Sequence, residues 1–292
     1  MSDPIFDDYL KADWWRHPNY NECLPAEKIA ELLDSDASLE EGVIFLECML
    51  AGDGVDILVE RAGRLAEISL LGIVNCGLGP QGAEKLADLA LTDTHTLDLS
   101  RNMFGLDWSR RLSDAPLLQG LERLGFAGNV LEPGEFTISG SITDALCRGK
   151  ACRTLKSLNL QDSYLTGSDT WFLFDAHHLP ELVDLDISNN VDLGNGGLQP
   201  WSQTAMRLKR LVAADCSLGD DQVRILAEGE ASEELLWLDL SFNPLGTEAV
   251  EALYESPHLE KLERLDLKHV SLTDDADQLL EQWRQKGVEI NT

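Results

Sequence analysis

The sequence is short of positive charge. Its 292 residues hold 23 lysines and arginines against 52 aspartates and glutamates, which gives a formal net charge of −29. Nucleic-acid binding rests largely on phosphate contacts by Lys and Arg, and anionic membrane surfaces also attract basic segments. The composition therefore argues against both kinds of partner and predicts attraction to a basic protein. The alternative, that the acidity serves only solubility, stays open at this stage.

A long apolar run is also missing. No segment approaches the roughly 18 apolar residues that a membrane span needs. The acidic start, Met1–Asp8, lacks the basic and apolar parts of a signal peptide. Only six cysteines occur, and none of them forms a Cys-x-x-Cys pair. Disulfide frameworks and zinc ribbons depend on closer cysteine spacing, so we expect free thiols and a cytoplasmic location.

Patterns that mark catalysis or a cofactor are absent from the sequence as well. His177 and His178 are adjacent and therefore diverge in regular structure, which makes them a poor metal pair. No cysteine has a nearby histidine that would activate it as a nucleophile, and no glycine-rich phosphate loop follows a strand pattern. We therefore expect a non-enzymatic protein without catalytic, cofactor-binding or metal-binding residues.

What the sequence does contain is leucine at a fixed spacing. The pattern Leu-x-x-Leu-x-Leu-x-x-Asn-x-Leu occurs eight times, and its copies start 26 or 27 residues apart except for one interval of 34. The copies start at Ile68, Thr94, Leu121, Leu155, Leu182, Leu208, Leu235 and Leu262. A sustained period of this length indicates a solenoid, whose units bury their apolar faces against one another.

Each copy is predicted to begin as a short strand. Leucines two apart, such as Leu238 and Leu240, point to one face of a strand, and the residue between them points to the other. The asparagine that follows can turn the chain and bond the backbone of neighbouring turns. Four repeats have asparagine at this place: Asn102, Asn129, Asn190 and Asn243. Cys76 and Cys216 replace it in two others, and we interpret both as structural.

The second half of each unit is predicted to be helical. An apolar residue recurs eight positions after the last strand leucine, as in Leu78 and Leu86, and the residues between suit a loop and an amphipathic helix. The run Leu78-Gly-x-x-Gly-Ala-x-x-Leu-Ala resembles the ribonuclease-inhibitor-like class of the leucine-rich repeat superfamily. The resemblance covers residues 64–292 and implies an α/β solenoid, a curved horseshoe with a parallel concave sheet and helices on its convex side. It implies no site residue, because members of this superfamily bind very different partners.

Two repeats depart from the pattern. The third has seven extra residues, which fall within 132–140. This segment is predicted to be either a binding loop or a tolerated surface loop. In the fifth, Asp192 takes a leucine position and Leu193 follows one place late, which predicts a one-residue bulge with Trp201 back in register.

The repeats divide the chain into three predicted segments: a helical N-terminal cap at 1–63, eight repeats at 64–272 and a C-terminal cap at 273–292. The N-terminal helices are expected at 25–33, 39–50 and 54–65. The C-terminal cap is expected to contain a helix at 274–285 and an edge strand at 287–290. An alternative for the first segment is a separate binding module, because Trp14, Trp15 and Tyr20 cluster there.

The outward positions of the strands supply the candidate site. Between the two core residues of each strand lie, in repeat order, Gly72, Asp98, Gly125, Asn159, Asp186, Val212, Asp239 and Asp266. The preceding outward column reads Leu70, Thr96, Arg123, Ser157, Asp184, Arg210, Trp237 and Arg264. Exposed aromatic residues amid charges are typical of interface hot spots, so we expect Trp237 to be exposed and to bind, with Phe242 and Tyr164 at the rim. The predicted protein-binding residues are Arg123, Asp184, Asp186, Arg210, Trp237, Asp239, Arg264 and Asp266.

A long curved sheet without a deep pocket suits a macromolecular ligand. We expect a protein-binding chain, monomeric when unbound, that acts as an acidic inhibitor or immunity-type binder of a basic partner protein. The alternatives are an adaptor, scaffold or effector module that binds several proteins, and a GTPase-activating protein, which no motif here favours. The sequence leaves open whether the concave face, the 132–140 loop or the N-terminal cap makes the contact.

Overall fold

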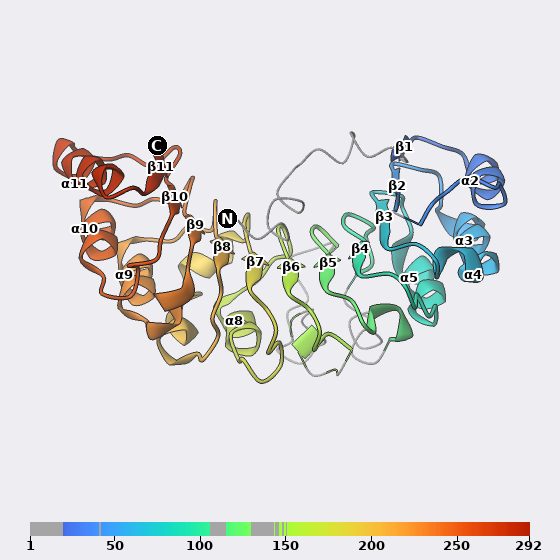
Figure 1. Cartoon of the computed structure of the whole chain (residues 1–292), viewed down its shortest axis with the longest axis horizontal. Coiled ribbons are helices and arrows are strands. Elements are labelled where there is room, and N and C mark those ends of the chain that lie inside the picture. The colour runs from blue at the N-terminus through green and yellow to red at the C-terminus, as the bar shows by residue number, and fades with distance from the viewer. Residues whose placement is uncertain are drawn as a thin grey trace.

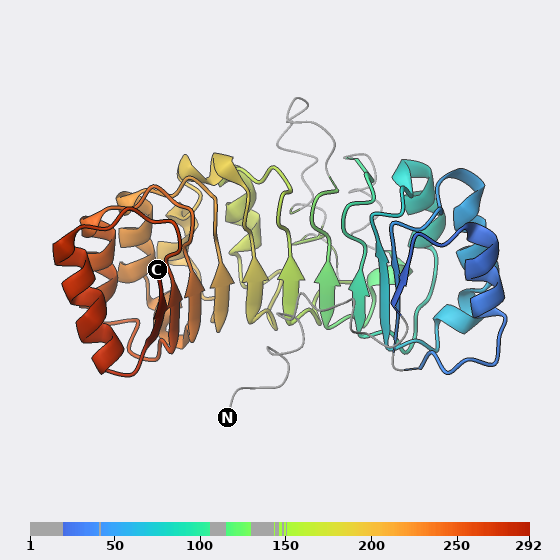
Figure 2. The ribbon, with the colours of Figure 1, turned by 90° about the horizontal axis from the view of Figure 1, so that it is seen from above.

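A computed structural model of the chain describes residues 20–40, 42–105, 115–129, 143, 146–147, 149 and 151–292. Within these residues, eleven strands form one parallel sheet in sequence order. The sheet lines the inner side of a horseshoe and the helices lie outside it (Figures 1 and 2). The predicted fold class, an α/β leucine-rich repeat solenoid with a concave parallel sheet, is confirmed.

Each unit contributes a short strand and a helical segment of variable length. The strands are β1 (Tyr20–Glu22), β2 (Val43–Leu46), β3 (Leu70–Val74), β4 (Thr96–Asp98), β5 (Arg123–Gly125), β6 (Ser157–Asn159), β7 (Asp184–Asp186), β8 (Arg210–Val212), β9 (Trp237–Asp239), β10 (Arg264–Asp266) and β11 (Glu289–Asn291). The α-helices are α2 (Ala26–Leu33), α3 (Asp56–Glu60), α4 (Ala62–Leu65), α5 (Gly79–Ala87), α8 (Gly167–Leu173), α9 (Asp220–Glu228), α10 (Thr247–Glu255) and α11 (Asp274–Gln285). The 3-10 helices are η2 (Gly52–Val55), η3 (Pro116–Leu118), η4 (Val191–Gly194), η5 (Gln199–Gln203) and η6 (Glu230–Glu234). None of the helices among the described residues is long and apolar enough to cross a membrane.

One continuous apolar core runs between the sheet and the helices. Neighbouring strands pair in register, so Leu185, Leu211 and Leu238 lie side by side, and each is completely buried. Burying one such side chain contributes about 1.5–3 kcal/mol. No unit could bury this face alone, which is why the repeat length of the sequence predicts the solenoid.

The asparagines at the end of the strands tie consecutive units together. Asn243 Oδ1 accepts hydrogen bonds from the backbone N–H groups of Cys216 and Leu218, both at 3.0 Å. Its Nδ2 donates to the carbonyls of Ala213 at 2.7 Å and Leu240 at 3.0 Å. One amide therefore satisfies backbone groups of two turns, as the sequence predicts.

Cysteine fills the same place in part. The Cys216 thiol donates to the carbonyl of Ile187 at 3.1 Å, and the Cys76 thiol donates to the carbonyl of Phe45 at 3.4 Å. All six cysteines are free thiols. Burial raises the pKa of Cys216 to about 12, so this thiol stays protonated. Its structural role is confirmed.

The N-terminal segment departs from the prediction of three helices. The helix expected at 25–33 is confirmed by α2. In place of one helix at 54–65, the chain forms the end of η2 and then two short helices, α3 and α4. The helix expected at 39–50 is wrong, because its residues form strand β2, which pairs with β3. Val43 and Phe45 alternate into the core, while Cys48 and Leu50 are buried at the places equivalent to Cys76 and Leu78. Strands on both sides of the predicted boundaries, at residues 63 and 272, belong to the same sheet. The division into three segments therefore stays a prediction.

A shared backbone conformation shows that these first strands belong to the repeat series. The residue just before the asparagine position has a left-handed φ of +51° to +61° in ten successive units: Cys23, Glu47, Asn75, Arg101, Gly128, Asp162, Asn189, Asp215, Phe242 and His269. Glycine adopts this conformation most readily, yet only one of the ten is glycine. The fold therefore imposes the turn on whichever residue stands there.

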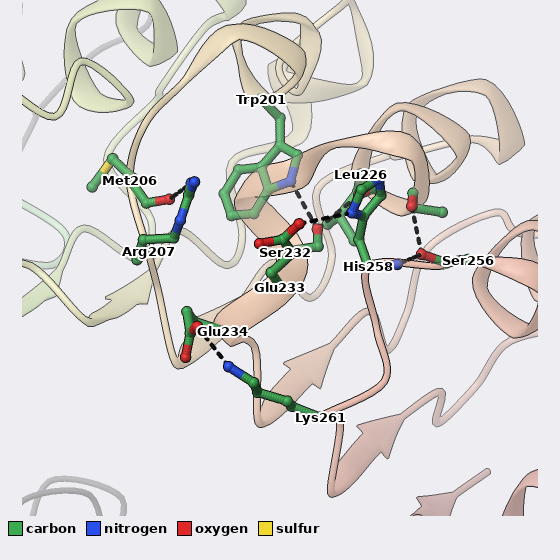
Figure 3. A network of polar contacts seen from close by, with 11 residues as sticks. Trp201, Met206, Arg207, Leu226, Ser232, Glu233, Glu234, Ser256, His258 and Lys261 are labelled. Atoms are coloured by element: carbon green, nitrogen blue, oxygen red, sulfur yellow. Dashed lines mark hydrogen bonds and ion pairs between the residues drawn. The ribbon is translucent and has the colours of Figure 1, made fainter.

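The predicted bulge in the fifth repeat is confirmed. Asp192 is exposed, whereas Leu193 and Trp201 are completely buried. Trp201 Nε1 donates to Ser232 Oγ at 2.9 Å, and that hydroxyl donates to the carbonyl of Leu226 at 2.7 Å (Figure 3). This network anchors η5 to the next unit. The fifth repeat has two short 3-10 helices, η4 and η5, in place of a full helix.

At the C-terminus, α11 confirms the helix predicted at 274–285. The edge strand β11 begins at Glu289, two residues later than predicted, because Gly287 turns the chain there with φ +100°. The 132–140 loop, Trp14 and Trp15 lie outside the described residues.

Candidate protein-binding face

Two columns of side chains line the concave sheet, because the strands pair in register. In the first column Asp184, Arg210, Trp237 and Arg264 are consecutive neighbours on β7 to β10. In the second column Asp186, Val212, Asp239 and Asp266 follow in the same order. Seven of the eight candidate residues thus lie together on four strands, and Arg123 lies two strands away on β5. The two columns use their charges differently.

In the first column, Asp184 and Arg210 pair with each other. Arg210 Nη1 and Asp184 Oδ1 form an ion pair at 2.6 Å, and both side chains are buried. The hydroxyl of Ser157 on β6 donates to the other carboxylate oxygen at 2.8 Å. A buried ion pair with filled oxygen sites fixes its geometry. Asp184 and Arg210 therefore support the face rather than project from it.

Trp237 lies between two guanidinium groups. The Arg264 guanidinium carbon is 4.1 Å from the centre of the indole and that of Arg210 is 4.8 Å away. These distances are within the range of cation–π attraction. Trp237 Nε1 also donates to Asp266 Oδ2 at 2.7 Å. The expectation of an exposed Trp237 is wrong: the indole is half-buried, because the arginines of both neighbouring strands pack against it.

Asp266 gathers donors from three strands. Arg264 donates to it at 2.8 and 3.1 Å, Asn291 at 2.7 Å and Trp237 at 2.7 Å. Burial acts to raise the pKa of Asp266, but the hydrogen bonds from Arg264, Asn291 and Trp237 and the Arg264 charge outweigh it and lower the pKa. The chain of contacts from Ser157 to Asn291 thus spans β6 to β11, and its two ends were not among the predicted site residues.

In the second column, Asp186 and Asp239 have no cationic partner among the residues that the structure describes. Each uses Oδ1 to accept a hydrogen bond from the backbone N–H two residues later, Ser188 at 3.0 Å and Ser241 at 2.9 Å. Asn159 makes the same bond to Gln161 at 2.9 Å, so this bond needs no charge. Burial raises the pKa of Asp186, against the lowering effect of the Ser188 hydrogen bonds and the Arg210 charge. Neither aspartate forms an ion pair within the part of the chain that the structure describes.

Two further groups on the face lack a partner among the described residues. Arg123 is half-buried on β5 and makes no ion pair there. Arg210 Nε is buried and donates to no acceptor. A buried donor without an acceptor costs free energy, so these two groups differ from the satisfied contacts around them.

Apolar side chains mark the rim where the strands end. Phe242 is 52% exposed and stacks on His269 with 4.3 Å between ring centres. Met103 and Val191 are exposed after β4 and β7, and Tyr164 is half-buried after β6. The predicted rim position of Phe242 is confirmed. This rim adds apolar surface beside the polar face.

Comparisons with known proteins agree with this architecture. Residues 235–253, which comprise β9 and most of α10, match the family described as leucine-rich repeat. The fold is a leucine-rich repeat solenoid. No curated protein matches the sequence.

Several solved structures are similar in fold. A Bacteroides fragilis protein shares 15% identity with a TM-score of 0.54, over 86% of this chain and 74% of that one. Human 5T4, also called trophoblast glycoprotein, shares 19% identity with a TM-score of 0.48, over 74% and 73%. A chain of the yeast Rad7–Elc1 complex shares 18% identity with a TM-score of 0.46, over 91% and 78%. At these identities the likeness concerns the fold alone.

Proposed function

We propose that this chain is a non-enzymatic binding protein that holds a basic protein partner on its concave face, as an inhibitor or immunity-type protein does. The observation that carries the proposal is the pair of aspartates, Asp186 and Asp239, which form no ion pair among the described residues and lie beside the rigid Trp237 cluster. An open concave sheet with unpaired carboxylates suits lysine and arginine side chains of a partner.

Rigidity of the face supports binding. Ordering a side chain at an interface costs about 0.5–1.5 kcal/mol. Trp237 is already ordered by Arg210, Arg264 and Asp266, so a partner that contacts its free edge avoids this cost. Tryptophan and arginine are also enriched among residues whose truncation weakens binding most.

The available area favours a contact that extends from the face to the rim. Strands spaced about 4.8 Å apart, each about 10 Å long, give eleven strands a strip of about 500 Å². A stable interface takes about 800 Å² from each partner. The exposed side chains of Met103, Val191 and Phe242 lie beside the strip and supply apolar area.

The compartment and repeat class are part of the same proposal. Six free thiols suit a reducing, cytoplasmic environment. A ribonuclease-inhibitor-like class of repeat is supported by four helices that each follow a strand and lie on the convex side: α5, α8, α9 and α10 (Figure 1).

The test begins with capture of partners from native lysate at low and then high salt. A single basic partner that is released by salt is the expected result. The purified partner is then titrated by calorimetry against the wild type and the double variant Trp237→Ala/Asp239→Asn, whose folding is checked by circular dichroism. We expect binding to be lost in this variant and kept in Glu251→Gln/Glu255→Gln, which changes two exposed residues of α10 on the convex side.

Undiminished binding by the folded concave variant would move the site off this face. Capture of several partners that do not respond to salt would contradict the inhibitor role, and would make the acidity a solubility property of an adaptor.

A further inference from the structure

The two aspartates of the concave face that form no ion pair among the described residues lie two strands apart. Asp186 is on β7, Val212 and Arg210 are on β8, and Asp239 is on β9. Strands are spaced about 4.8 Å apart, so the two carboxylates are separated by about 9.6 Å along the sheet, with β8 midway. This spacing restricts the backbone that a partner can lay along the sheet.

An α-helix matches both intervals. It rises about 1.5 Å per residue and repeats every 3.6 residues, so positions i, i+4 and i+7 lie on one face at 0, about 6 and about 10.5 Å. An extended strand rises about 3.3 Å per residue with alternating faces. Its same-face residues fall at about 6.6 and 13 Å, which misses the second carboxylate.

The middle position has a chemistry of its own. Arg210 is 5% exposed and its Nη1 is held by Asp184, so its guanidinium is out of reach of a partner's side chain. A second charge is not needed there, because the guanidinium is already paired. Val212, between the two carboxylates in the second column, is apolar, so a small uncharged side chain of the partner suits the middle position.

We propose that the partner inserts a basic amphipathic helix along the sheet axis over β7 to β9, with Lys or Arg at i and i+7 and a small uncharged residue at i+4. The proposal rests on the proposed function and specifies the surface that the partner presents. The first cation pairs with Asp186 and the second with Asp239. The residues of the first column, from Asp184 to Arg264, lie beside the helix.

The probes are two synthetic helical peptides of the same composition, each about 18 residues long. The matched peptide has Lys at i and i+7 and Ala at i+4. The permuted peptide moves the second Lys to i+5, which turns it about 140° away from the first. Affinities of both are measured by fluorescence anisotropy at low salt for the wild type, for Asp186→Asn/Asp239→Asn and for the convex control Glu251→Gln/Glu255→Gln.

We expect the matched peptide to bind the wild type and the convex control at least tenfold more tightly than the permuted peptide. The Asp186→Asn/Asp239→Asn variant should remove this preference, and it should remain folded because Asn159 makes the same backbone bond.

The inference is overturned if the wild type binds neither peptide, binds both equally, or if the preference survives in Asp186→Asn/Asp239→Asn. These outcomes leave the proposed function standing as long as a captured basic protein still requires the concave face. If that protein binds the Trp237→Ala/Asp239→Asn variant unchanged, the proposed function itself fails.

Discussion

Asp184 and Arg210 form an ion pair at 2.6 Å on the concave face, yet their side chains are only 3% and 7% exposed. Two charges facing a solvent-filled curve are thus withdrawn from solvent by their neighbours. Breaking such a pair leaves one buried charge without compensation. Their energetic role is therefore distinct from that of the unpaired aspartates beside them.

The first prediction concerns this pair. Asp184→Asn should lower the free energy of unfolding by about 3–5 kcal/mol, because the Arg210 charge loses its partner. The double variant Asp184→Leu/Arg210→Met removes both charges and should recover most of the loss. Urea unfolding of Asp184→Leu, Arg210→Met and the double variant measures the coupling. Additive effects would contradict the assigned pairing.

The second prediction concerns Asp186. Burial raises its pKa above the ordinary value of 3.8, so its charged form costs stability at neutral pH. This cost is absent below pH 3.8 and is fully present once the pH has risen through the folded pKa. Asp186→Asn should therefore be as stable as the wild type at pH 7 or more stable, by about 0.5 kcal/mol, and the gain should vanish on acidification. Thermal unfolding across pH measures both, and a loss of stability at pH 7 would be inconsistent with this account.

The third prediction concerns Asp266, for which stability depends on pH in the opposite direction. The pKa of Asp266 is lowered, so its contribution to stability is present above pH 3.8 and is lost as the pH falls through the folded pKa. Asp266→Asn should cost about 1–2 kcal/mol at pH 7, at the low end for charged hydrogen bonds because Arg264 is a third exposed and screened. The difference from the wild type should shrink in acid. A difference that is constant with pH would show that the charge of Asp266 is not responsible.

The fourth prediction concerns the asparagines between units. Asn243→Ala should destabilise the chain by about 3 kcal/mol or more, because five backbone groups lose a hydrogen bond to its amide. Asn243→Cys should cost less, since a thiol at this place can donate to the preceding unit as Cys216 does. Urea unfolding ranks the two variants, and hydrogen exchange at the Cys216 and Leu218 amides locates the effect. Equal costs would mean that the thiol does not replace the amide donor.

The sequence predicts the repeat because the leucine spacing follows directly from burial of one strand face. It fails at β2 because the first leucine of that unit is displaced. Glu40 stands 28 residues before Ile68, and the buried Leu39 lies one place earlier. Val43 to Leu46 then reads as part of an apolar run without a repeat. The equivalence becomes visible only when β2 pairs with β3.

For the site residues, too, the sequence predicts one part and misses another. Strand alternation predicts correctly which residues face the concave side. It does not predict that Trp237 would be packed between Arg210 and Arg264, because side-chain contacts depend on which strands are neighbours. Reading the first column across consecutive repeats would have placed an arginine on each side of the tryptophan. Ser157 and Asn291 were missed for another reason: they act as hydrogen-bond partners of Asp184 and Asp266 rather than as charges.

In the sheet, each strand pairs only with the strands next to it. In such a solenoid the small rotation between neighbouring units adds up over the whole arc and sets its curvature. A ligand that bridges Asp186 on β7 and Asp239 on β9 would connect two strands that are not neighbours in the sheet. Binding would therefore fix the curvature of the horseshoe, and the unbound protein would sample wider and narrower arcs than the bound one.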